Sequence, residues 1–140
     1  MSPITIPGGG GTAQKYYTPV MIEGSDTLLY TDTTAKTIAT IPANSMIIEI
    51  RYRVVTAFDD SGTNTFDTGI TGEEDAFADG RSLEGTSALY PTFSFWSGDT
   101  SFRENAIRAS ETSILAKYIG SNTDSTQGEL KFYITYVIFS

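Results

Sequence analysis

The sequence predicts an all-β domain, a jelly-roll-like antiparallel β-sandwich with a flexible N-terminal arm. Apolar and polar residues alternate over many short runs, turn-forming residues separate these runs, and long runs of strong helix formers are missing. Thr and Ser, which favour strands and turns, are abundant, and the 140 residues include 8 Tyr, 8 Phe and one Trp. This length fits a single domain, which we place at residues 15–140 behind an arm of residues 1–14.

The arm begins with an apolar tip, in which Ile4 and Ile6 are flanked by Pro3 and Pro7, and continues with four glycines at 8–11. Glycine loses more backbone entropy on ordering than any other residue, so this segment cannot form a stable element alone. One interpretation is a disordered tail. The other is an arm whose two isoleucines dock on a neighbouring subunit.

Nine strand candidates follow the arm at short spacing, separated by clusters of Gly, Pro, Asn, Asp and Ser. Their number fits a jelly roll of about eight strands. Residues 102–110 could also form two helical turns, but the neighbouring strands favour extended structure. The candidates are residues 16–22, 27–31, 36–41, 46–58, 65–70, 88–96, 107–110, 113–119 and 129–139.

Residues 41–79 carry the clearest pattern. Between residues 46 and 58, apolar and charged residues alternate, which is typical of a strand with one buried and one solvated face. Turn residues follow at 59–64, and then a second alternating run. We interpret the two runs as a β-hairpin, followed by an acidic loop at 73–79. The alternating positions assigned to the buried face are Ile48, Ile50, Tyr52 and Val54, then Phe66, Thr68 and Ile70.

The final run, residues 129–139, is apolar on both of its faces. An exposed edge strand of this kind would aggregate. We therefore expect it to be central in its sheet or covered by another subunit.

Cysteine and histidine are both absent. Disulfide frameworks, Ser-His-Asp or Cys-His catalysis and typical zinc sites are therefore excluded. The formal net charge of −8 disfavours nucleic acid and anionic membranes as partners. No apolar run long enough for a transmembrane helix and no secretion leader is visible, so we expect no membrane span and no export by the general route. We expect a protein that is not an enzyme and needs no cofactor or metal.

Two segments deserve testing as ligand sites. The acidic run 73–79 could supply oxygen ligands to calcium, but its spacing does not match an EF-hand, and a solvated loop explains it equally well. The aromatic segment 90–102 includes Trp96 and could stack on sugar rings, or it could belong to the core. If Trp96 is exposed, it belongs to an interface or a ligand site.

Several short motifs carry a family resemblance. The runs I-P-A-N-S-x-I-x-x-I from residue 41, V-x-x-A-F-D from 54, S-G-T-x-T-F-D-x-G from 61 and the acidic D-A-F at 75–77 resemble small β-sandwich decoration, or cement, proteins of tailed bacteriophage heads. The resemblance covers roughly residues 35–80 and 105–139, including a closing strand from Gly128 to Val137.

This resemblance implies a non-enzymatic homotrimer that is made in the host cytoplasm and binds the major capsid protein on the capsid exterior. A carbohydrate-binding module, a tail-fibre tip or another tail component remains the alternative. The residues that we expect at a capsid or subunit interface are Ile4, Ile6, Phe58, Phe77, Trp96, Tyr133 and Phe139.

Overall fold

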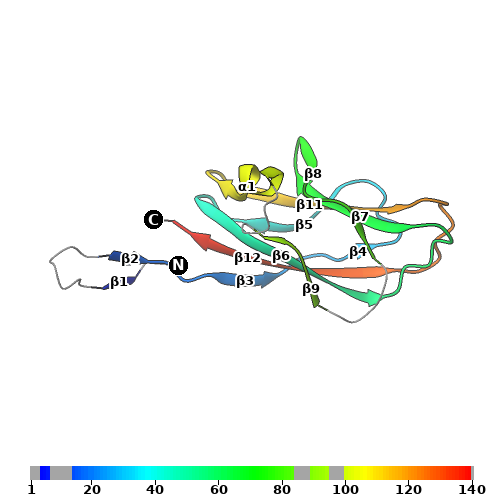
Figure 1. Cartoon of the computed structure of the whole chain (residues 1–140), viewed down its shortest axis with the longest axis horizontal. Coiled ribbons are helices and arrows are strands. Elements are labelled where there is room, and N and C mark those ends of the chain that lie inside the picture. The colour runs from blue at the N-terminus through cyan, green and yellow to red at the C-terminus, as the bar shows by residue number, and fades with distance from the viewer. Residues whose placement is uncertain (1–3, 7–13, 84–88, 95–99, 140) are drawn as a thin grey trace.

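The computed structural model describes residues 4–6, 14–83, 89–94 and 100–139. Within them the chain is almost entirely antiparallel β-structure in two packed sheets, with one short helix, so the predicted all-β sandwich is confirmed (Figure 1). The strands are β1 (Ile4–Ile6), β2 (Gln14–Tyr16), β3 (Val20–Glu23), β4 (Leu28–Leu29), β5 (Lys36–Ile41), β6 (Ser45–Thr56), β7 (Asn64–Ile70), β8 (Glu73–Ser82), β9 (Leu89–Ser94), β10 (Ile107–Arg108), β11 (Thr112–Gly120) and β12 (Glu129–Ile138), and the helix is α1 (Thr100–Ala106).

Strand pairing is nested in the order of the chain. The outermost strands β3 and β12 pair, then β5 with β11, β6 with β9, and β7 with β8, all antiparallel. The first sheet has the order β10-β6-β12-β3, with β9 also on β6, and the second has the order β5-β11-β7-β8. Successive nested pairs therefore lie in opposite sheets. This is a long antiparallel hairpin rolled up on itself, which is the jelly-roll arrangement that the sequence predicts.

The core fills the space between the two sheets. Phe66 of β7 and Phe132 of β12 face each other from opposite sheets, with ring centroids 5.5 Å apart at 69°. At another place in the core, Phe77 of β8 meets Phe102 of α1 at 5.3 Å. Edge-to-face rings of this kind add to the stabilisation from buried area. Phe66, Thr68 and Ile70 of β7 are buried, as predicted, but Asp67 and Gly69 between them are buried too, so burial in this strand does not alternate.

Strand β12 is central in its sheet, because β6 lies along one side and β3 and β4 along the other. Leu130, Phe132 and Ile134 are fully buried, whereas Tyr133 on the opposite face is half-buried. A central position explains the apolar character of this strand within a single chain.

The predicted hairpin between β6 and β7 is wrong. β6 belongs to the first sheet and β7 to the second, so residues 57–63 cross from one sheet to the other. The turn-forming residues of this segment serve such a crossing as well as they serve a hairpin, because neither connection is marked by a distinct local sequence.

The burial predicted for one residue of β6, Ile48, is also wrong. Ile47 and Ile50 are fully buried, whereas Ile48 is only half-buried. The pairing with β12 shifts register between Thr135 and Tyr136, which leaves Ile48 without a direct partner. This β-bulge inserts one residue and transfers the buried face from even to odd positions.

Three further predictions need correction. Residues 73–79 form most of strand β8 rather than a loop, with Ala76, Phe77 and Ala78 buried. Residues 100–106 form a helix rather than extended structure, because Phe102 and Ala106 share one helical face that packs into the core. Extended structure resumes at β10, as predicted. The predicted strand 16–22 is divided by residues 17–19, where Pro19 cannot donate a ladder hydrogen bond.

Strands β1 and β2 form a separate antiparallel hairpin, in which Ile4 is opposite Tyr16 and Ile6 is opposite Gln14. Figure 1 shows this hairpin projecting beyond the end of the sandwich where the C-terminus lies. The sandwich proper begins at β3. Residues 1–3 and 7–13 of the predicted arm lie outside the described residues.

Candidate interaction surfaces

Two loops distant in the sequence are joined at the end of the sandwich opposite to the arm (Figure 1). We call residues 57–63 and 121–128 together the loop clasp. Asp60 lies at its centre and is buried. Its Oδ1 accepts hydrogen bonds from the backbone N–H groups of Gly62 at 2.8 Å and Asn122 at 3.0 Å, and its Oδ2 accepts one from Asp124 at 3.3 Å. One carboxylate thus satisfies donors on both loops.

Two exposed aspartates, one on each loop, add further hydrogen bonds between the loops. Asp59 accepts hydrogen bonds from the N–H groups of Thr126 at 2.7 Å and Gln127 at 3.1 Å, and from the hydroxyl of Thr126. Reciprocally, Asp124 accepts from the N–H of Ser61 at 2.9 Å and from its hydroxyl at 2.6 Å. Each loop therefore contributes carboxylates to the other.

Beneath the clasp lies a buried polar centre. The Tyr118 hydroxyl donates to Asn64 Oδ1 at 2.5 Å and lies 2.7 Å from Ser125 Oγ. Asn64 Oδ1 also accepts from the Asp60 N–H at 3.1 Å, so the strands and the clasp share one network. The ring of Phe58 stacks on Tyr118 at 4.8 Å and closes this centre from the core side.

These contacts shift three pKa values. Hydrogen bonds from the Thr126 hydroxyl and N–H lower the pKa of Asp59 below its ordinary value of 3.8. Hydrogen bonds from the Ser61 hydroxyl and N–H lower the pKa of Asp124 in the same way. Burial raises the pKa of Tyr118, and the neighbouring aspartates add to that effect. All three shifts favour the protonation states present at neutral pH.

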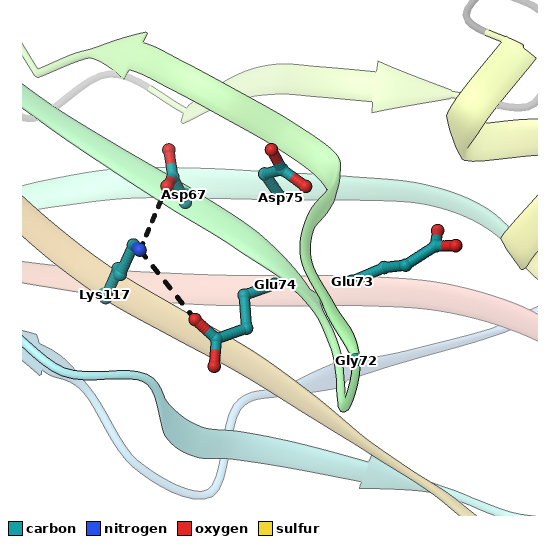
Figure 2. Close-up of a pocket in the computed structure, with 6 residues that line it drawn as sticks. All are labelled: Asp67, Gly72, Glu73, Glu74, Asp75 and Lys117. Atoms are coloured by element: carbon teal, nitrogen blue, oxygen red, sulfur yellow. Dashed lines mark ion pairs between the residues drawn. The ribbon is translucent and has the colours of Figure 1, made fainter.

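A second polar surface lies on the outer face of the second sheet, where a depression of about 380 Å³ is lined by β7, β8 and β11. Lys117 Nζ lies 3.7 Å from Asp67 Oδ2 and 3.8 Å from Glu74 Oε2, whereas Figure 2 shows Glu73 pointing away from this pair. Asp67 also accepts a hydrogen bond from the Gly80 N–H at 2.8 Å. Its carboxylate is therefore already engaged.

The described residues contain no group of three or more carboxylates arranged to hold a metal ion. In β8 three consecutive acidic residues and Asp79 lie on an edge strand of the second sheet, where charged side chains hinder pairing with the edge of another molecule. The acidic run therefore has a structural explanation that needs no ligand.

The predicted interface residues fall in different environments. Phe58 and Phe77 are core residues, 8% and 0% exposed, so neither reaches the surface of the chain as it is folded. Tyr133 is half-buried on the outer face of the first sheet, and Phe139 is 38% exposed. Ile4 and Ile6 lie on β1.

Trp96 lies outside the described residues. Of the aromatic segment around it, residues 89–94 form β9, which pairs with β6 in the first sheet. Sequence reasoning missed the loop clasp entirely, because residues 121–127 read only as a break between strands.

The part of the chain that the structure describes contains no helix long and apolar enough to cross a bilayer. No family profile matches the chain, and no curated protein matches its sequence.

Solved structures do match it. A chain of the cyanophage Pam1 capsid asymmetric unit has a TM-score of 0.61 at 15% identity, over 88% of this chain and 86% of that one. A chain of the Ralstonia phage GP4 capsid has a TM-score of 0.57 at 12% identity, over 89% and 85%. A chain of the acid-stable capsid of Helicobacter pylori bacteriophage KHP30 has a TM-score of 0.54 at 13% identity, over 89% and 94%. At these identities the likeness shows a shared fold.

Proposed function

We propose that this chain is a structural component of a tailed-bacteriophage virion, and specifically a decoration protein that binds the exterior of the capsid. The observation that carries the proposal is the fold shared with chains of three phage capsids. Each match covers 85% or more of both chains, so those chains are close to this one in length. A domain that corresponds to a whole capsid component, rather than to part of a larger one, fits an accessory subunit.

The surface chemistry supports binding rather than catalysis. Histidine and cysteine are absent, and the aspartates of the loop clasp are engaged by N–H and hydroxyl donors. The chain carries a formal net charge of −8, and Asp75 and Asp79 lie exposed on the edge strand β8. Such a surface is attracted to basic patches on a protein lattice, and salt weakens this attraction.

The proposed mechanism is linkage. A protein that binds the assembled lattice but not free capsid subunits stabilises the lattice by RT ln(1 + [L]/Kd) for each site, about 2.7 kcal/mol at 100 times Kd. Three linked copies would multiply the effective concentration at neighbouring sites. The partners in this proposal are the major capsid protein and two further copies of the chain in a homotrimer.

The test uses shells assembled from the major capsid protein of the phage that encodes this chain. Purified chain is mixed with these shells and with unassembled capsid subunits, and both mixtures are sedimented at low and moderate salt. We expect the chain to sediment with the shells alone and to raise the temperature at which they open. Failure to bind shells at any salt concentration would refute the decoration role.

The role of the acidic edge is tested by the variant Asp75→Asn/Asp79→Asn, which removes two exposed charges from β8. We expect its binding to be weaker at low salt and equal to wild type at high salt. The matched control Glu104→Gln/Glu111→Gln removes two exposed charges elsewhere and should bind like wild type. Equal losses in both variants would assign the effect to net charge and not to this edge.

A sugar-binding tail component is the second candidate. A hollow of about 220 Å³ is lined by Tyr30, Tyr118 and several hydroxyl-bearing residues. Tyr118 is only 2% exposed, so Tyr30 is the ring left to stack on a sugar. Binding on a glycan array, lost in Tyr30→Ala and combined with no affinity for shells, would favour this candidate.

A further inference from the structure

An apolar patch lies on the outer face of the first sheet, at the end from which the arm projects. Met46 of β6 is in register with Ile107 of β10 on one side and with Val137 of β12 on the other, so the three residues form one row. Phe139 follows Val137 by two positions, and its ring meets that of Tyr17 with centroids 5.6 Å apart at 74°. We call these five residues the end patch.

The end patch is separate from the core between the sheets. Ile47 is fully buried between the sheets, and successive residues of a strand face opposite sides, so Met46 faces outward. Val137 is 6% exposed yet does not belong to the core cluster, because it too lies on the outer face. Ile107 and Phe139 are 59% and 38% exposed, which leaves apolar area open to solvent at this end.

The backbone register of the projecting hairpin β1–β2 pairs Ile4 with Tyr16, Thr5 with Lys15 and Ile6 with Gln14. Because alternate positions of a strand share a face, positions 4, 6, 14 and 16 lie on one face of the hairpin backbone. Tyr16 is 45% exposed. An isolated two-stranded hairpin is only marginally stable in water, so a surface that covers this face would stabilise it.

The hairpin is poorly placed to cover the end patch of its own chain. Only residues 17–19 connect β2 to β3, and within them Tyr17 already packs on Phe139 while Pro19 has a fixed φ. Figure 1 shows the hairpin leading away from the sandwich. The hairpin of another molecule has no such restriction.

The distribution of charge along the sequence indicates that the molecule whose end patch receives the hairpin is a second copy of this chain. Residues 1–16 contain Lys15 and no carboxylate, whereas the remaining residues contain the other 8 of the 9 basic residues and all 17 acidic ones, a formal charge of 8 − 17 = −9. Two sandwiches therefore repel each other over most of their surface. The hairpin is attracted to a neighbouring sandwich, and none of the five residues of the end patch is acidic.

We propose that the β1–β2 hairpin of one copy docks through its Ile4, Ile6 and Tyr16 face on the end patch of another copy. The contact joins two different surfaces. A closed oligomer therefore forms either as a dimer in which two molecules exchange hairpins or as a ring of several molecules. The contact deepens the proposed self-association of the chain and needs no capsid.

Cross-linking tests this contact directly, because the chain has no cysteine. Gln14→Cys lies on the docking face of the hairpin, and Ile107→Cys lies on the exposed part of the end patch. The two variants, carrying tags of different size, are mixed at equal concentration under mild oxidation. We expect a mixed disulfide at least ten times more abundant than with the control Ile119→Cys, which is 39% exposed on the second sheet. Equal yields would overturn the proposal.

Sedimentation velocity over a range of concentrations gives the second measurement. We expect wild type to self-associate, and Ile107→Asp or Ile4→Ser/Ile6→Ser to weaken association at least tenfold, while Ile119→Asp associates like wild type. Circular dichroism verifies that each variant is folded. A wild-type chain that stays monomeric would overturn the proposal. If the chain cross-links as expected but does not bind capsid shells, the decoration role is refuted and the proposed contact between copies is still supported.

Discussion

Asp60 on one interstrand loop accepts a hydrogen bond at 3.0 Å from the backbone N–H of Asn122, which lies 62 residues further along the chain. The same carboxylate holds the N–H groups of Gly62 and Asp124. Because one loop crosses between the sheets and the other connects β11 to β12, this single side chain fixes the closed end of the jelly roll.

Removal of the Asp60 carboxylate should therefore destabilise the fold. In Asp60→Ala three backbone N–H groups lose their acceptor, at a position where the Asp60 side chain is only 5% exposed. We expect a loss of about 2 kcal/mol in the free energy of unfolding, measured by urea denaturation. The control Asp75→Ala removes an exposed carboxylate from β8 and should change stability by less than about 0.5 kcal/mol. Similar values for both variants would contradict a special role of the clasp.

The clasp should also make stability depend on pH in the acidic range. The folded-state pKa values of Asp59 and Asp124 lie below the ordinary value of 3.8, so the folded state binds fewer protons than the unfolded state. Their stabilising contribution is complete above pH 3.8 and is lost as the pH falls through the lowered pKa values. We expect Asp59→Asn/Asp124→Asn to flatten the dependence of thermal stability on pH below that value. A slope equal to that of wild type would show that other carboxylates dominate acid unfolding.

Local pattern was sufficient to predict the fold class and most of the strands. β12 reads as a strand because Leu130, Phe132 and Ile134 alternate with half-buried residues, and such alternation depends only on the pleat of the backbone. β8 escaped prediction because Glu73, Glu74 and Asp75 mask the buried Ala76 and Phe77 that follow. Acidic residues are common in loops, and here they protect an edge strand instead.

Long-range pairing and the clasp were not predictable from local pattern. The bulge at Ile48 depends on the register between β6 and β12, which are far apart in the sequence. Likewise, the aspartates at 59 and 60 have the composition of a simple turn, and only the fold brings the loop 121–127 against them. The sequence led us to predict Ile4, Ile6 and Phe139 as interface residues, but not the rest of the end patch, because Tyr17, Ile107 and Phe139 come from three separate segments.

Replacement of Gly128 should lower the free energy of unfolding. Its φ of +151° is a conformation that other residues rarely adopt, and an added Cβ would lie 2.2 Å from the ring of Phe58. Gly128→Ala combines backbone strain with a clash in the core, and we expect a loss of about 3 kcal/mol in denaturation experiments. Gly72 is the matched control, because its φ is +88° but its Cβ would meet nothing within 4 Å. Gly72→Ala should cost about 1 kcal/mol, from strain alone. Equal costs would show that the contact with Phe58 adjusts freely.

Removal of a buried hydroxyl, that of Thr68, should stabilise the fold, in contrast to the substitutions above. Thr68 is 0% exposed on the core face of β7, and its Oγ1 has no hydrogen-bond partner. Thr68→Val has nearly the same shape and removes an unsatisfied polar group, so we expect a gain of about 1 kcal/mol in the free energy of unfolding. On the same strand, Thr65 donates its hydroxyl to the carbonyl of Ile119 at 3.4 Å near the surface, and Thr65→Val should give no such gain. A destabilised Thr68→Val chain, measured by urea denaturation alongside this control, would mean that the hydroxyl is satisfied in solution.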